Sequence, residues 1–219
     1  MRAAQDNDVN LIRTSDGATL TAEVRSPPQP AGIVILIHGS GSSRSSPRNR
    51  AVARHLEDRG FATVRVDLLT ALELDAHNRA SDIDLLTQRL VDVTNWVGDR
   101  PELAGLEVGY FAASTGAAAA LRAAESLGPV IGAVVSRGGR PDLAGAALRR
   151  VESPTLLIVG ADDDQLVVER NKQAMAQLAG LHELVLLPGA GHVIAEPVPL
   201  KQVEHLAAEW FTRCMAATY

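Results

Sequence analysis

Ser114 stands where a predicted strand runs directly into a predicted helix, within the segment GYFAASTGAAAAL at 109–121. A serine at the apex of such a turn is held in a strained backbone conformation, and the residues two before and two after it must be small. Those residues are Ala112 and Gly116. The usual pattern has glycine at both places, so Ala112 departs from it but keeps its steric logic. The segment indicates either a nucleophilic serine or an ordinary strand-to-helix turn.

A nucleophilic serine needs a base, which is most often a histidine. The chain has six histidines, and four of them are most simply solvated or packing residues: His55, His77, His182 and His205. His192 differs, because it ends the glycine-rich stretch PGAGH that follows the predicted strand at 182–187. Glycines give this loop the freedom to swing an imidazole over the edge of a sheet. We therefore expect His192 to be the general base.

The carboxylate that would orient this histidine has several candidates. Three consecutive aspartates, at 162–164, follow the predicted strand at 154–160, and Asp142 follows the strand before it. The chain order serine, acid, histidine is the one that a nucleophile elbow uses. Three adjacent carboxylates could instead hold a divalent cation, but the stretch lacks the spaced oxygen ligands and the glycine of a calcium loop. The residues alone leave the acid open among these aspartates.

A loop rich in glycine and serine, GSGSS at 39–43, follows the buried run IVILI at 33–37. His38 precedes this loop, where a turn supported by the histidine can present backbone N–H groups to an oxyanion. Such a loop between strand and helix could also cradle a phosphate, but no Gly-Lys-Ser or Gly-Lys-Thr follows it. We interpret His38 as structural support for an oxyanion hole.

The elements that must position these residues alternate along the chain. Short apolar runs are separated by amphipathic segments, which is typical of a parallel sheet covered by helices on both faces. The runs lie at 33–37, 61–67, 106–111, 130–135, 154–160 and 182–187. VNLIR and ATLTAEV flank the turn signal SDG and predict an antiparallel hairpin before the sheet.

Helices are expected at 47–59, from about 81 to 97, and at 115–127, 165–178 and 199–215. Ser46 before Pro47 predicts the start of the first helix. Ser81, with Asp84 three residues later, resembles a capping box at the start of the second.

Length and composition favour one compact α/β domain spanning 1–219, since about 150 residues per domain is the usual size. The formal net charge of −5 gives no global reason to approach nucleic acid or an anionic membrane. No apolar run reaches the length that crosses a bilayer. The opening MRAAQDNDVN lacks the pattern of a signal peptide, and the lone Cys214 cannot form an internal disulfide. We therefore expect a cytoplasmic protein.

These motifs resemble the α/β-hydrolases, and among them the lidless dienelactone-hydrolase-like group. HGSGSSRSSPRNR, AASTGAAAAL, VGADDD and PGAGH occur in the family's order, and the resemblance covers about residues 20–215. The chain resembles more closely small bacterial hydrolase domains, some of them joined to a phosphoribosyltransferase domain. The implied fold is the α/β-hydrolase fold, with a mostly parallel central sheet, helices on both faces and an N-terminal antiparallel hairpin. Only about six residues separate Ser136 from the helix expected near Asp142, where many members insert a helical cap, so no cap domain is expected.

Position by position, the resemblance implies roles for individual residues. Ser114 is the implied nucleophile, His192 the general base and Asp163 the orienting acid, because the family acid sits in a Gly-x-x-Asp pattern. The backbone N–H groups of Thr115 and Ser40 are the implied oxyanion hole. Dienelactone hydrolase itself uses a cysteine nucleophile, so its particular substrate is not carried over.

We expect hydrolysis of a small carboxylic ester or lactone through an acyl-enzyme, with no cofactor and no metal. Thioester or amide cleavage uses the same residues, and an interaction or regulatory module of hydrolase fold is the alternative from another class. Arg44, Arg137 and Arg140 lie near the expected site and could bind an anionic ester through bidentate hydrogen bonds. The simpler interpretation is that most of these arginines are solvated or paired with carboxylates.

Overall fold

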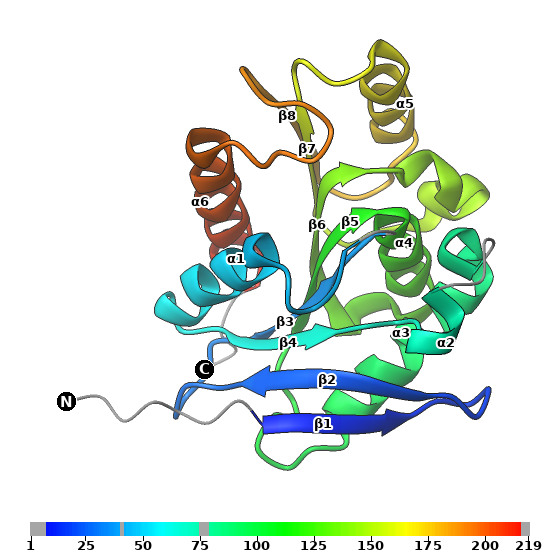
Figure 1. The fold of residues 1–219 in the computed structure, drawn as a ribbon, viewed down its shortest axis with the longest axis vertical. Helices are drawn as coiled ribbons and strands as arrows, with labels where there is room; N and C mark the ends of the chain where they lie inside the picture. The colour runs from blue at the N-terminus through cyan, green and yellow to red at the C-terminus, as the bar shows by residue number, and fades with distance from the viewer. Residues whose placement is uncertain (1–7, 40–41, 75–78, 216–219) are drawn as a thin grey trace.

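The computed structural model describes residues 8–39, 42–74 and 79–215, which build one eight-stranded sheet (Figure 1). The strands are β1 (Asp8–Arg13), β2 (Thr19–Arg25), β3 (Ile33–Ile37), β4 (Ala62–Val66), β5 (Val108–Ser114), β6 (Ile131–Gly139), β7 (Thr155–Gly160) and β8 (His182–Leu187). Their order across the sheet is β1-β2-β4-β3-β5-β6-β7-β8. Strands β3 to β8 pair in parallel, whereas β2 pairs antiparallel with both β1 and β4. The expected mostly parallel sheet with an N-terminal antiparallel hairpin is confirmed.

Helices cover both faces of the sheet. They are α1 (Pro47–Asp58), α2 (Ala71–Leu74), α3 (Ile83–Gly98), α4 (Thr115–Leu127), α5 (Gln165–Met175) and α6 (Pro197–Cys214). Shorter 3₁₀ segments lie at Arg79–Ser81, Gly128–Val130 and Pro141–Arg150. Helices α1 and α6 pack side by side on one face, and α3 and α4 pack on the other (Figure 1). No cap domain interrupts the described chain between β6 and β7, because the 3₁₀ segment there packs against α4 and α5.

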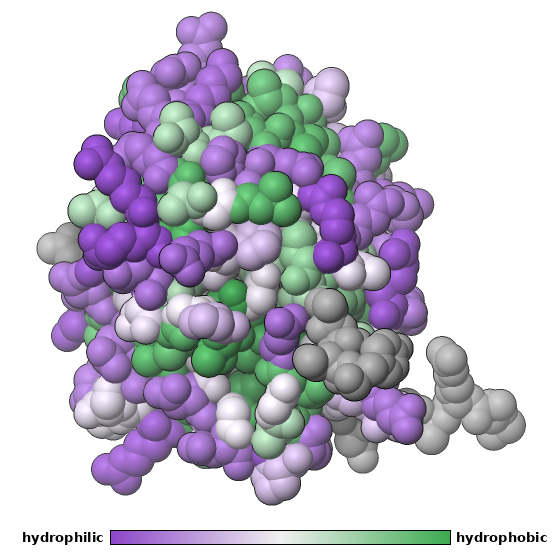
Figure 2. Space-filling model, turned by 180° about the vertical axis from the view of Figure 1, so that it is seen from behind, coloured by the Kyte–Doolittle hydropathy of each residue, from purple (hydrophilic) through white to green (hydrophobic). Residues whose placement is uncertain are grey.

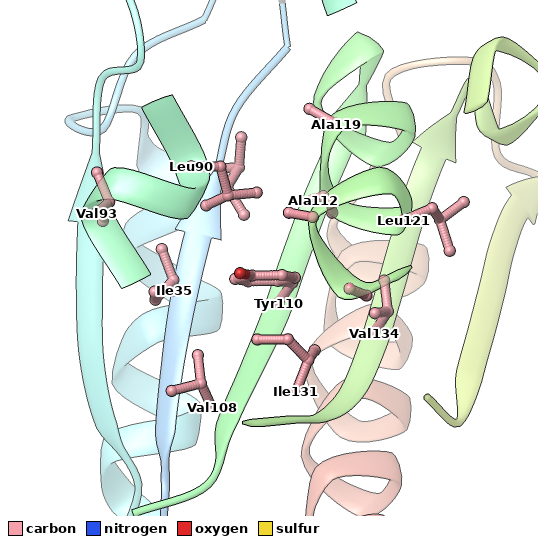
Figure 3. Close-up of a cluster of buried hydrophobic side chains, with 14 of the residues drawn as sticks. Ile35, Leu90, Val93, Val108, Tyr110, Ala112, Ala119, Leu121, Ile131 and Val134 are labelled. Carbon is pink, nitrogen blue, oxygen red and sulfur yellow. The ribbon is translucent and has the colours of Figure 1, made fainter. Parts of the chain in front are cut away.

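Each buried strand supplies side chains to two cores, because neighbouring residues of a strand point to opposite faces. On β5, Tyr110 packs in the core under α3 and α4, as Figure 3 shows, whereas Phe111 packs in the core under α1 and α6. The buried Tyr110 hydroxyl shares a hydrogen bond of 2.7 Å with Oγ1 of Thr94 on α3. Burial raises the pKa of Tyr110, so the hydroxyl stays neutral. The two cores fix β5 from both sides and therefore fix the position of Ser114 at its end.

The start of α3 differs from the capping box expected at Ser81. Ser81 ends the 3₁₀ segment Arg79–Ser81, and the N-cap is Asp82, whose Oδ1 accepts a hydrogen bond of 3.0 Å from the backbone N of Leu85. A carboxylate is the stronger acceptor at the positive end of a helix. The cap expected for α1 is confirmed, since the Ser46 side chain accepts from Asn49 N at 3.2 Å.

The surface seen from behind in Figure 2 is mostly hydrophilic, with hydrophobic side chains gathered in separate patches. Among the described residues, no helix is both long enough and apolar enough to cross a membrane.

Candidate active site

Ser114 is the last residue of β5 and the N-cap of α4, with φ of 51° and ψ of −130°. Among the described non-glycine residues, only Ser114 and Ile194 have a positive φ. This conformation is strained for any residue with a Cβ, and it persists where the surrounding structure forces it. The backbone N of Arg140 donates a hydrogen bond of 3.0 Å to the Ser114 carbonyl oxygen. The segment thus has the strained backbone that a nucleophile elbow requires, which is one of the two interpretations that its sequence left open.

Small residues surround Ser114 because other backbone segments pass very close to it. A Cβ added to Gly39 would clash with the Ser114 Cβ and would lie 3.1 Å from Oγ. A Cβ added to Gly116 would lie 2.9 Å from Cγ2 of Ile37. Ala112, where the usual pattern has glycine, is buried in the core drawn in Figure 3. The loop after β3 therefore lies directly against the serine, where an oxyanion loop is needed.

His192 and Asp163 form a hydrogen-bonded pair. Nδ1 of His192 lies 2.9 Å from Oδ2 of Asp163. The Asp163 side chain is only 3% exposed, whereas that of His192 is 48% exposed. A buried carboxylate on Nδ1 fixes the tautomer in which Nδ1 carries the proton and Nε2 is free to accept one.

The other candidate acids lie elsewhere. Asp164 is the N-cap of α5, and its Oδ1 accepts a hydrogen bond of 2.8 Å from Leu166 N. Asp142 pairs with Arg140, and Asp162 is exposed. Of the aspartates that the sequence left open, the structure brings Asp163 to His192.

Backbone contacts hold the acid loop and the histidine loop together. Asp162 N donates to Ala190 O at 3.0 Å, and a Cβ added to Gly160 would clash with that same carbonyl oxygen. A Cβ added to Gly138, which has φ of 51°, would lie 2.5 Å from the His192 carbonyl oxygen. Only glycine leaves room for these two approaches, and at Gly138 it also allows the positive φ without strain.

The same part of β6 links His192 to Ser114. Gly139 is the register partner of Ser114, and the preceding Gly138 lies against His192. The described residues contain no hydrogen bond between Ser114 Oγ and His192. Such bonds are often long without substrate and tighten when it binds. The strained serine at the end of β5 is therefore linked, through Gly138 and Gly139 of β6, to the loop that carries the histidine of the pair.

On the other side of Ser114, charged and polar side chains support the loop after β3. His38 Nε2 lies 2.8 Å from Asp67 Oδ1, which also accepts from Arg44 N at 2.7 Å. Burial opposes ionisation of Asp67, but the hydrogen bonds from His38 and Arg44 outweigh it and lower the pKa of Asp67 to about 2. The ionised carboxylate of Asp67 therefore fixes the His38 ring, in line with the expected role of His38 as structural support for this loop.

The charged side chains of Arg44, Glu23 and Arg65 also help to hold the loop after β3. The Arg44 side chain donates to Asp67, and its Nε lies 3.3 Å from Oε1 of Glu23. Arg65 donates to Oε2 of Glu23 at 2.7 Å and to the Arg44 carbonyl oxygen at 3.1 Å. Sequence reasoning missed Glu23, Arg65 and Asp67. The one available signal was that Arg65 and Asp67 carry charges in and directly after a mostly apolar strand.

The structure describes only one of the two residues that are expected to donate backbone hydrogen bonds to an oxyanion. Thr115 is the first residue of α4, and its Oγ1 donates to Ala80 O at 3.0 Å. Ser40 lies outside the described residues, as does His77. A small apolar hollow of about 20 Å³ adjoins Thr115. It is lined by His38, Gly39, Leu68, Leu69, Leu74, Ala80, Leu86 and Thr115.

The three arginines expected near the site have different surroundings. Arg44 is held by Asp67 and Glu23, and Arg140 makes two hydrogen bonds of 2.8 Å to Asp142. For Arg44 and Arg140, these contacts favour the interpretation that the arginines are paired with carboxylates and do not bind substrate. Arg137 is different.

Arg137 is 5% exposed, and its Nη1 is buried with no hydrogen-bond partner among the described residues. Burial, assisted by the nearby positive charge of Arg48, lowers the pKa of Arg137 to about 10. A buried guanidinium group without a partner is costly unless a ligand supplies one.

Comparison with known proteins places these features in context. No protein-family model matches the chain. The chain is 44% identical to a dienelactone hydrolase from Anabaena variabilis ATCC 29413, whose crystal structure superposes with a TM-score of 0.91 over 96% of this chain and 98% of that one. Est1E from Butyrivibrio proteoclasticus, at 16% identity, shares the fold with a TM-score of 0.76 over 94% of this chain and 99% of its own.

Two curated relatives from Mycobacterium tuberculosis carry a provisional phosphoribosyl transferase name. One is from strain H37Rv and the other from strain CDC 1551, and each is 54% identical over 209 residues. The match covers 94% of this chain but 46% of each relative. The chain therefore spans about half the length of these relatives.

Proposed function

Because the chain belongs to the dienelactone hydrolase family of the α/β-hydrolase superfamily, we propose that it is a serine hydrolase cleaving a small carboxylic ester or lactone. The observation that carries this proposal is the His192–Asp163 hydrogen bond in a chain whose Ser114, at the same edge of the sheet, has the strained elbow conformation. The transferase name of the curated relatives is not carried over, because the matched part of those proteins corresponds to this hydrolase fold and the rest is unmatched.

The proposed reaction begins with attack of Ser114 Oγ on the carbonyl carbon, while His192 Nε2 accepts the hydroxyl proton. Asp163 keeps the proton on Nδ1 and stabilises the imidazolium that forms. The tetrahedral intermediate then expels the alcohol, which takes the proton from His192. Water activated by the same histidine hydrolyses the acyl-enzyme and regenerates the serine.

The oxyanion would form beside the N-terminus of α4, where Thr115 N–H and the helix dipole favour negative charge. The second proposed donor is the backbone N–H of Ser40, by its position in the family motif. The preceding residue, Gly39, packs against Ser114, which supports a donor from this loop. The adjoining apolar hollow of about 20 Å³ favours a small group next to the reacting carbonyl.

A substrate panel tests this proposal. Short esters, lactones and thioesters are assayed with the unmodified protein and with Ser114→Ala. We expect turnover of an ester or lactone that the variant lacks. Thioesters hydrolysed much faster than esters would replace ester by thioester as the substrate class, and turnover retained in the variant would contradict the serine mechanism.

The substrate is further proposed to carry an anionic group that Arg137 binds. Arg137 directly precedes Gly138, which lies against His192, and its Nη1 has no partner among the described residues. We expect Arg137→Gln to raise the KM of a carboxylate-bearing ester about tenfold, the value of one charge-assisted hydrogen bond. A neutral isostere and the Arg140→Gln control should show no such change. Equal kinetics for charged and neutral esters in the unmodified protein would contradict this role.

A further inference from the structure

A second cavity, of about 140 Å³, lies between α1 and the strands β2 and β4. Figure 1 shows α1 beside β4, with β2 next to it in the sheet. The lining residues are Arg25, Arg50, Ala53, Arg54, Glu57 and Arg65. None of these residues belongs to the proposed triad or to the hollow beside Thr115, although Arg65 also belongs to the charged network that supports the loop after β3.

The cavity is strongly basic although the chain has a formal net charge of −5. Among the described residues that line it, four are arginines and one is a carboxylate, Glu57, a difference of three positive charges. Glu23, which accepts a hydrogen bond from Arg65, reduces the excess to two if it is included. Glu57 already accepts from Thr63 Oγ1 at 2.6 Å and lies 3.8 Å from Nη1 of Arg25. It cannot neutralise the other guanidinium groups as well.

The arginines are close enough to repel one another. Arg65 is 4% exposed, and burial lowers its pKa. The carboxylates of Glu23 and Glu57 oppose this shift, and the positive charges of Arg50 and Arg25 add to it. Arg50 and Arg54 are four residues apart on α1, a spacing at which like charges destabilise a helix. Among the described residues, neither of these two guanidinium groups has an ion pair or a hydrogen bond. An anion in the cavity would relieve this repulsion.

We propose that this cavity binds a phosphate group. Guanidinium groups match phosphate oxygens in bidentate geometry. A phosphate monoester carries a charge of about −1.5 to −2 at pH 7, which balances the excess around the cavity better than one carboxylate would. The volume of about 140 Å³ is below the roughly 300–1,000 Å³ of sites that enclose a whole drug-sized ligand. The cavity therefore fits free phosphate, or the terminal phosphate of a larger molecule that otherwise remains outside.

Arg50 and Arg54 are the residues to change, because their side chains are exposed and make no hydrogen bond or ion pair with other described residues. Arg65 is unsuitable, since it also supports Glu23 and the Arg44 carbonyl group. Arg59 provides a matched control, because it is an exposed arginine directly after α1 that does not line the cavity. Unfolding midpoints without phosphate verify that the variants fold.

Isothermal titration with inorganic phosphate, phenyl phosphate and acetate tests the proposal, at low ionic strength so that screening is weak. We expect saturable binding of phosphate, weakened about tenfold by Arg50→Gln or by Arg54→Gln. Arg59→Gln and Ser114→Ala should bind like the unmodified protein, which separates this site from the proposed active site. Tighter binding of phenyl phosphate supports a larger phosphorylated ligand, and equal binding supports free phosphate. Absence of saturable binding, equal affinity for acetate, or equal weakening by Arg59→Gln overturns the proposal.

Discussion

The two halves of the candidate active site are held in place by different means. The acid–base half, His192 and Asp163, depends on backbone hydrogen bonds and close glycine contacts between two loops. The oxyanion half depends on ionised side chains that are mostly buried, namely Glu23, Arg44, Arg65 and Asp67 around His38. The side chain of His192 is about half exposed, whereas that of His38 is nearly buried.

This difference matches the role that is proposed for each half. Hydrogen-bond donors that stabilise an oxyanion act best when they are fixed before the reaction, so a rigid charged network suits them. A general base must exchange protons with substrate and water, so an accessible imidazole suits it. Changes in the acid–base half should therefore affect turnover alone, and changes in the oxyanion half should affect stability as well.

His192→Ala should have the largest effect on turnover. Removing the base of a serine triad can cost on the order of 10⁶ in kcat. The unfolding midpoint should hardly change, because the side chain is half exposed. Steady-state ester hydrolysis and thermal unfolding measure the two quantities, with His205→Ala, an exposed histidine on α6, as the control. Comparable loss in the control would remove the special role of His192.

Asp163→Asn should lower kcat by about 10⁴, because the amide favours the wrong imidazole tautomer. Asp162→Asn should have little effect, since Asp162 is exposed and does not contact His192. Kinetics of the two variants side by side measure this ranking. If Asp142→Asn were the more damaging change, the orienting acid would lie after β6 instead of β7.

Asp67→Asn should weaken the oxyanion half and lower the free energy of unfolding by about 2 kcal/mol, since it removes the charge from the hydrogen bonds that Asp67 makes with His38 and Arg44. Chemical denaturation measures the loss, and turnover should fall with it. An unfolding free energy equal to that of the unmodified protein would mean that the network does not hold this half.

The loss of unfolding free energy in Asp67→Asn should depend on pH in a defined direction. The pKa of Asp67 is lowered to about 2 in the folded protein, against about 3.9 in an unfolded chain. The stabilisation by the ionised carboxylate is therefore complete above about pH 4 and is lost as pH falls through about 2. The difference between the unmodified protein and Asp67→Asn should shrink over this interval in denaturation series. A constant difference would assign the effect to shape instead of charge.

Asp164→Ala should have the smallest effect. Its side chain caps α5, and loss of an N-cap typically costs about 1 kcal/mol of stability. Turnover should stay near that of the unmodified protein, because Asp163 and not Asp164 contacts His192. Denaturation and kinetics of the same sample test both parts, and a large loss of turnover in a folded variant would contradict them.

The sequence predicted the sheet, most helices and the loops of the acid–base half, because each of these depends on local pattern. Ser114 ends the buried strand β5, His192 lies in the loop after β8, and glycines mark the close approaches. The oxyanion half could not be predicted in the same way, because its pairs are distant in sequence. Glu23 and Arg65 are 42 residues apart and meet only through the pairing of β2 with β4.

The partners of the arginines were unpredictable for the same reason. Arg44 and Arg140 look alike in the sequence as possible substrate contacts, and only the fold reveals their carboxylate partners. Arg137 looks the same as these two, yet its Nη1 has no partner among the described residues.

Labelling with an active-serine phosphonate tests the central claim, a serine nucleophile activated by the acid–base half, most directly. Mass spectrometry of peptides from the labelled protein identifies the modified residue. We expect one adduct on Ser114 in the unmodified protein, much slower labelling in His192→Ala and none in Ser114→Ala. A folded, unmodified protein that forms no adduct, or forms it on another residue, would contradict the account.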